Sequence, residues 1–164
     1  MHVDDLHIED TEYEFEGTRL VGHLAVDRVS GGPRPAVLVC HEGPGLSDHA
    51  KHVAERLAGL GYVAFALDYH GGGLVLPREE MMTKLGAMMG NPDRIRGLAA
   101  AGLDQLLAQP EADHGRVAAI GYCFTNPHAA QSGMLGSEYH EPSDRRSWQG
   151  MIGLIDETFG PATI

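Results

Sequence analysis

Residues 117–130 read VAAIGYCFTNPHAA, and the first four form an apolar run typical of a strand buried on both faces of a sheet. The run leads directly into Gly121-Tyr122-Cys123-Phe124. A sharp turn from strand into helix at this place would expose the Cys123 side chain at the end of the strand. The stretch therefore predicts a buried strand with a candidate nucleophile at its carboxyl end.

Two further apolar runs precede this strand, at residues 36–40 and 62–67. Apolar residues recur at helical spacing after Ser47 or Asp48, either of which can cap a helix, and residues 78–89 and 93–108 also have the composition of helices. Strands that alternate with helices predict an α/β fold, with a mainly parallel twisted sheet and helices on both faces. In such a sheet, ligands bind at the carboxyl ends of the strands.

The two ends of the chain add antiparallel and helical elements. Residues 12–27 alternate in two short runs around Gly17, which predicts a β-hairpin. Residues 145–159 predict a final amphipathic helix. A stripe of methionine and leucine in the helix 78–89 is most simply interpreted as core packing. With 164 residues and no internal repeat, we expect one domain, residues 1–164.

Composition excludes several classes of protein. The chain has 12 Lys and Arg against 23 Asp and Glu, for a formal net charge of −11, which argues against a nucleic-acid partner. No apolar run approaches the ~20 residues that span a bilayer, and the acidic N-terminus lacks the pattern of a signal peptide. With only Cys40 and Cys123, a disulfide scaffold is not expected, and a cytoplasmic protein is predicted.

Three motifs together resemble the dienelactone hydrolase family of α/β-hydrolases. They are PAVLVCHEGPGLSDH at 35–49, GYVAFALDYHGGG at 61–73 and RVAAIGYCF at 116–124. FTNPHAA at 124–130 and YHEPSDRRSWQGMIGLIDETFG at 139–160 also resemble the C-terminal part of family members. The resemblance covers nearly the whole chain and implies hydrolysis of a small-molecule carboxylic ester or lactone, without a cofactor, a metal or a membrane partner.

The resemblance also implies roles for particular residues. Cys123 is the implied nucleophile, and its oxyanion is held by the backbone N–H groups of Gly43 and Phe124. Glu42 is expected beside the thiol, where it influences protonation of the resting enzyme. A small buried side chain is the structural alternative for Cys123, and Cys40 is expected in the core. At the end of the preceding strand, candidate substrate-binding residues are Tyr69 and His70.

The sequence departs from the family pattern at Phe124. In the family, tens of residues separate the nucleophile turn from His-x-Phe-Thr-Asn-Pro, whereas here Phe124 serves both motifs. Tyr122 stands where the catalytic His is expected, no Asp lies between Cys123 and the tail, and Thr125 replaces the usual glycine. Arginines that clamp an acidic substrate in the family have no clear counterparts. The chain therefore resembles a shortened α/β-hydrolase fold that lacks the later strands.

Histidines elsewhere in the chain are candidates for the missing base or for metal ligands. Asn126 and Pro127 predict a short helix 127–132, which would put His128 about one turn beyond Cys123 as a base. A solvated loop histidine is the alternative, His140 is a second candidate, and Asp144 can orient either one. Asp48, His49 and His52 share one face of a predicted helix, but three such residues are more often a solvated first turn than a metal site.

Loss of the later strands has a consequence for the sheet. Residues 117–120 become an edge strand, which predicts pairing with a second copy or aggregation. Two hypotheses follow. The first is an ester or lactone hydrolase that uses Cys123; the alternative is a non-catalytic remnant that binds small molecules or associates with itself through the exposed sheet edge.

Overall fold

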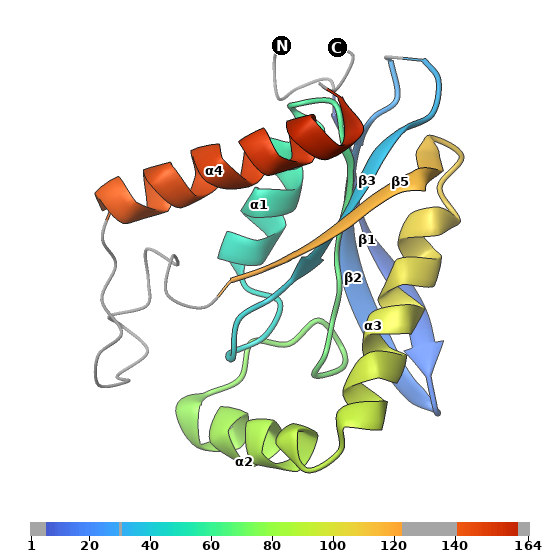
Figure 1. The fold of residues 1–164 in the computed structure, drawn as a ribbon. Helices are drawn as coiled ribbons and strands as arrows, with labels where there is room; N and C mark the ends of the chain where they lie inside the picture. The colour runs from blue at the N-terminus through green and yellow to red at the C-terminus, as the bar shows by residue number, and fades with distance from the viewer. Residues whose placement is uncertain (1–5, 30, 123–140, 161–164) are drawn as a thin grey trace.

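The computed structural model describes residues 6–29, 31–122 and 141–160, and the structural statements below concern these residues. They form one mixed sheet with helices packed around it (Figure 1). In chain order the elements are β1 (Leu6–Phe15), β2 (Thr18–Asp27), β3 (Arg34–Cys40), α1 (Asp48–Ala58), β4 (Val63–Ala66), α2 (Arg78–Met89), α3 (Pro92–Leu107), β5 (Ala112–Gly121) and α4 (Glu141–Phe159).

The sheet has the strand order β1-β2-β4-β3-β5. β4, β3 and β5 run parallel to one another, whereas β1 and β2 are added as an antiparallel hairpin. The two-residue turn of this hairpin is formed by Glu16 and Gly17, which both have positive φ, as the twist of a tight hairpin requires. The predicted fold class is confirmed, and so is the hairpin around Gly17.

Helices cover both faces of the sheet (Figure 1). α1 and α4 pack on one face, where Val53, Leu57 and Ile155 join a cluster with alternate residues of β3 and β4. α3 packs on the other face, with Leu98 and Leu106 against the opposite side chains of the same strands. Each fully buried side chain of this size contributes about 1.5–3 kcal/mol. Because both faces are covered, β3 from Ala36 onward and the whole of β4 are apolar.

β5 lies at an edge of the five-stranded sheet. It pairs with β3 from Ala36↔Val117 to Cys40↔Gly121, and no described strand pairs with its other side. Its residues are correspondingly more exposed than those of β3 and β4. The sequence prediction of an edge strand at 117–120 is therefore confirmed for the described part of the chain.

The prediction for the methionine stripe of α2 is largely wrong. Met81 is buried, but Met82 and Met89 are 54% and 83% exposed. α2 lies beyond the carboxyl ends of the strands rather than flat on a face of the sheet (Figure 1), so one short stretch of the helix reaches the core. Among the helices of the described residues, none has the length and apolar character needed to cross a membrane.

Two helical glycines provide a matched test of the packing between α3 and β4. A Cβ atom at Gly102 in α3 would lie 2.7 Å from Cβ of Leu67, whereas a Cβ at Gly86 in α2 would meet no atom within 4 Å. We expect Gly102→Ala to lower the free energy of unfolding by roughly 1–3 kcal/mol because the contact is overpacked. Gly86→Ala should raise it by roughly 0.5–1 kcal/mol, since alanine favours the helix. Denaturant unfolding measures both, and equal effects would contradict the close approach of α3 to the sheet.

Candidate active site

The candidate site lies where the three parallel strands end. β3 leads into Cys40 and the loop His41–Gly43, β4 leads into the loop Asp68–Gly73, and β5 ends at Gly121. Gly121 pairs with Cys40, and the backbone N–H of Tyr122 donates to the Cys40 carbonyl at 3.4 Å. The loops that follow β3 and β4 and the end of β5 therefore lie at the same end of the sheet, as the sequence predicted.

Glu42 is held in a buried position in the loop between β3 and α1. Its side chain is 5% exposed, and its Oε1 accepts a hydrogen bond from the Ser47 hydroxyl at 2.9 Å. Ser47 is the residue that precedes α1, and its side chain makes no cap hydrogen bond to the helix because it faces Glu42 instead. Glu42 is thus a fixed carboxylate next to the loop that would hold an oxyanion.

The loop that contains Gly43 is joined to the loop after β4 by three contacts. Nε2 of His70 donates to the Gly43 carbonyl at 2.7 Å, the N–H of Leu76 donates to the Pro44 carbonyl at 2.7 Å, and Gly45 forms a β-bridge with Val75. His70 is 4% exposed. These contacts fix the backbone on both sides of Gly43 to the loop that follows β4.

α2 covers the same loop from outside. A Cβ atom at Gly43 would lie 3.3 Å from both the Met81 sulfur and a Leu85 methyl group, so the helix packs directly on the Gly43 backbone. Gly45 has φ 126° and would bring a Cβ to 2.1 Å from the Leu74 carbonyl oxygen. Both the conformation and the close approach require glycine at position 45.

Asp68 organises the loop that carries His70. Its carboxylate is fully buried and accepts backbone N–H bonds from four residues. These donors are Val21, His70, Gly71 and Gly73, at 2.7–3.1 Å. A carboxylate surrounded by N–H donors in this way forms charge-assisted hydrogen bonds, which offset the cost of burying its charge.

His41 is held as a neutral ring between the two loops. Its Nδ1 donates to the Glu42 carbonyl at 2.7 Å, and its Nε2 accepts the N–H of Tyr69 at 3.1 Å, so both nitrogens are used in one tautomer. Burial lowers the pKa of His41, against smaller opposing effects. Because Nδ1–H and the Nε2 lone pair are both occupied, His41 has a structural role here rather than that of a base.

Tyr69 contacts the second cysteine of the chain. Its hydroxyl donates to Sγ of Cys40 at 3.5 Å, and burial raises the pKa of both groups. Cys40 is half-buried and packs at the margin of the core, in agreement with its predicted place. Both side chains therefore stay protonated near neutral pH, and Cys40 is a weak candidate for a nucleophile.

The structure brings together Glu42, Gly43, Tyr69 and His70 from the residues that the sequence singled out. Cys123, Phe124 and His128 lie outside the described residues, as does His140. Asp48, His49 and His52 form no metal cluster, and the described residues contain no other group of three or more metal-ligating side chains. His49 instead packs against the Tyr122 ring, and His52 lies next to Glu55.

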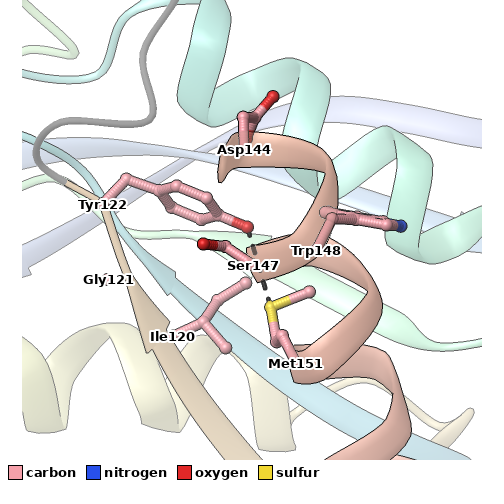
Figure 2. A pocket seen from close by; sticks show the side chains of 7 residues that line it. All are labelled: Ile120, Gly121, Tyr122, Asp144, Ser147, Trp148 and Met151. Carbon is pink, nitrogen blue, oxygen red and sulfur yellow. Dashed lines mark hydrogen bonds between the residues drawn. The ribbon is translucent and has the colours of Figure 1, made fainter. Parts of the chain in front are cut away.

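A pocket of about 290 Å³ lies between the end of β5 and α4 (Figure 2). Ile120, Gly121 and Tyr122 line one side, and Asp144, Ser147, Trp148 and Met151 line the other. Figure 2 shows Tyr122 reaching across toward α4, where its hydroxyl lies 3.7 Å from the Met151 sulfur. No sequence pattern indicates this pocket, because the apolar side of α4 has the same spacing as an ordinary core-facing helix.

These features define the class of the protein. A mainly parallel sheet with helices on both faces, and with polar loops gathered at the carboxyl ends of the strands, is a shortened α/β-hydrolase fold. Residues 22–136, more than half of the chain, match the model of the dienelactone hydrolase family. The chain belongs to the dienelactone hydrolase family.

Individual relatives agree with this assignment. A protein of Aquifex aeolicus (strain VF5), provisionally named a carboxymethylenebutenolidase, is 39% identical over 64 residues, or 37% of this chain and 26% of the relative. A protein of Escherichia coli (strain K12), provisionally named hydrolase fragment YghX, is 36% identical over 77 residues, or 47% of this chain and 56% of the relative. The chain therefore spans from about a quarter to about half of the length of these curated relatives.

Two solved structures are similar over almost the whole chain. A dienelactone hydrolase-like promiscuous phosphotriesterase from metagenomic libraries has a TM-score of 0.90 and 26% identity, covering 93% of this chain and 98% of that chain. A protein designated m3DLH has a TM-score of 0.89 and 28% identity, with the same coverage. Both likenesses include the arrangement of sheet and helices described above.

The contact between His70 and Gly43 can be tested by amide hydrogen exchange. We expect His70→Phe to leave the Gly43 carbonyl without its donor and to open the joined loops more often. The amides of Gly45 and Leu76 should then exchange about tenfold faster, for a loss of about 1.4 kcal/mol. His70→Gln, which keeps a side-chain N–H, should change exchange less, and the amide of Ala64 in β4 serves as the control. Unchanged exchange of Leu76 in His70→Phe would show that His70 does not hold this loop.

Proposed function

We propose that this chain is a carboxylic ester or lactone hydrolase in which the Cys123 thiolate is the nucleophile. The observation that supports the proposal most directly is the end of β5, which stops two residues before Cys123 and pairs with Cys40, two residues before Glu42. The proposal rests in addition on the family match and on the sequence motif at 121–124. A reduced thiol is needed for this chemistry, which favours the cytoplasm as the compartment.

The proposed reaction has two steps. In the first, the Cys123 thiol gives its proton to His128, the thiolate sulfur forms a bond to the carbonyl carbon, and the oxyanion accepts hydrogen bonds from the N–H groups of Gly43 and Phe124. The carbon–oxygen bond of the ester then breaks, and the leaving alkoxide takes a proton from His128. In the second step, water gives a proton to His128 and attacks the thioester, and the carboxylic acid leaves while the thiolate returns.

The described residues of the site fit supporting roles in this scheme. The joined loops keep the Gly43 backbone in a fixed position, and preorganised N–H donors of this kind account for a large part of catalysis in acyl transfer. Glu42 is a buried carboxylate beside the site, and its negative charge favours the neutral thiol over the thiolate before substrate binds. Tyr69 holds Cys40 as a thiol, so Cys123 is the cysteine to which the nucleophilic role is assigned.

Intact-mass spectrometry after brief exposure to p-nitrophenyl acetate tests the proposal. We expect one acetyl adduct that forms quickly and then clears, that is absent in Cys123→Ala and that is still present in the matched variant Cys40→Ala. In His128→Ala the adduct should persist, because deacylation lacks its base. Equal labelling of both cysteines, or none, would count against a catalytic Cys123, and rapid clearing in His128→Ala would exclude His128 as the base.

The exposed edge of β5 favours a second candidate function, self-association. Along its outer side, where no described strand pairs with it, β5 can offer backbone N–H and C=O groups to another chain, and two copies of β5 can pair across a twofold axis. We expect the wild-type chain to sediment as a dimer and Ala119→Lys to sediment as a monomer, because Ala119 is exposed on this edge and a lysine there opposes pairing. A wild-type chain that is monomeric at all concentrations would contradict this candidate.

A further inference from the structure

The pocket between β5 and α4 lies directly beside the proposed nucleophile in the sequence. Tyr122, which lines it, precedes Cys123, and Gly121 pairs with Cys40 at the end of β3. Because Cys123 directly follows Tyr122 in the sequence, the pocket belongs to the same end of β5 as the proposed site. The pocket is therefore placed to receive one of the two substituents of an ester.

The walls of the pocket suit an apolar group. The lining includes the apolar side chains of Ile120, Trp148 and Met151, together with the ring of Tyr122. The guanidinium of Arg56 lies 3.7 Å from the centre of the Trp148 ring, a contact that holds the indole in one orientation. The volume of about 290 Å³ is at the small end of the ~300–1,000 Å³ range of ligand sites and exceeds the ~150 Å³ of a cavity that holds benzene.

The charges around the pocket disfavour an anion. None of the described residues that line it is Lys or Arg, whereas Asp144 is among them. Burial raises the pKa of Tyr122 to about 12; Arg56 opposes this effect, while the carboxylates of Asp144 and Glu42 add to it. The groups that act on Tyr122 are thus two anions and one cation, and that cation is stacked on Trp148.

We propose that this pocket binds an uncharged aryl or short alkyl group of the substrate and that the chain prefers neutral esters to esters that carry a carboxylate. The inference rests on the proposed function, whose site it extends. It names a specificity that follows from the apolar wall of the pocket and from the carboxylate of Asp144 that lines it. A carboxylate in the pocket would lose its hydration and meet another carboxylate, while the cation that acts on Tyr122, Arg56, is already stacked on Trp148.

Binding can be measured apart from catalysis because Trp148 is the only tryptophan of the chain. The matched probes are 4-phenylbutyramide and 4-phenylbutyrate, which differ in charge but are not esters. We expect the amide to change Trp148 fluorescence saturably and the carboxylate to bind at least about tenfold more weakly. Ser147→Phe should weaken binding of the amide by filling the pocket, and circular dichroism checks that this variant is folded.

Two substitutions on α4, each of which removes one negative charge, distinguish a local effect of Asp144 on binding from an effect of the net charge of the chain. Asp144→Asn should strengthen binding of 4-phenylbutyrate several-fold while leaving the amide nearly unchanged. Glu157→Gln, about 20 Å away along the helix, should change neither, since this distance exceeds the screening length in physiological salt. If both substitutions strengthen binding of the carboxylate equally, Asp144 does not set the preference and the proposal is overturned.

Turnover then distinguishes failure of this inference from failure of the proposed function. We expect p-nitrophenyl butyrate to be hydrolysed faster than mono-p-nitrophenyl succinate, with the preference reduced in Asp144→Asn. Saturable amide binding without any turnover would contradict the proposed hydrolase and leave the pocket supported. Turnover without a Trp148 signal, or equal binding of the two probes, would overturn the pocket as the determinant of specificity.

Discussion

Four backbone N–H groups converge on the buried carboxylate of Asp68, and the candidate site depends on this arrangement. The carboxylate ties the loop after β4 to Val21 in β2, and the same loop carries His70 to the Gly43 carbonyl. The Asp68 N–H in turn donates to the hydroxyl of Tyr13, which adds β1 to the network. Burial of an isolated carboxylate would be strongly unfavourable, so the loop conformation and the charge stabilise each other.

The elements of the fold were largely predictable because their signals are local. Apolar runs identified β3, β4 and β5, and Glu16-Gly17 provides the turn that Gly17 predicted. The exposure of Met82 and Met89 was not predictable in the same way. Periodicity shows that a helix has an apolar side, but not how much of that side reaches another element, and α2 meets the rest of the protein at the end of the sheet.

The candidate site was predictable only in outline. The positions of the strand ends indicated where Glu42, Gly43, Tyr69 and His70 would meet, because the carboxyl ends of parallel strands lie at the same end of the sheet. The sequence offered His70 as a substrate contact, whereas the structure shows its ring hydrogen-bonded to a carbonyl 27 positions earlier in the chain. The contact of Tyr122 with Met151 and the stacking of Arg56 on Trp148 likewise join distant segments. Contacts between residues so far apart in the chain produce no local pattern in a single sequence.

The segment that joins β5 to α4 carries the proposed nucleophile, but both of its neighbours are anchored without it. β5 is anchored by its ladder with β3, and α4 by the burial of Ile155 and by the hydrogen bond from the Tyr62 hydroxyl to Asp156 at 2.9 Å. The stacking of Arg56 on Trp148 joins α4 to α1 as well. Described residues alone therefore account for how β5 and α4 are held in the fold. The shortened chain thus keeps the framework of an α/β-hydrolase, and the proposed reaction adds to this framework the residues of one connecting segment.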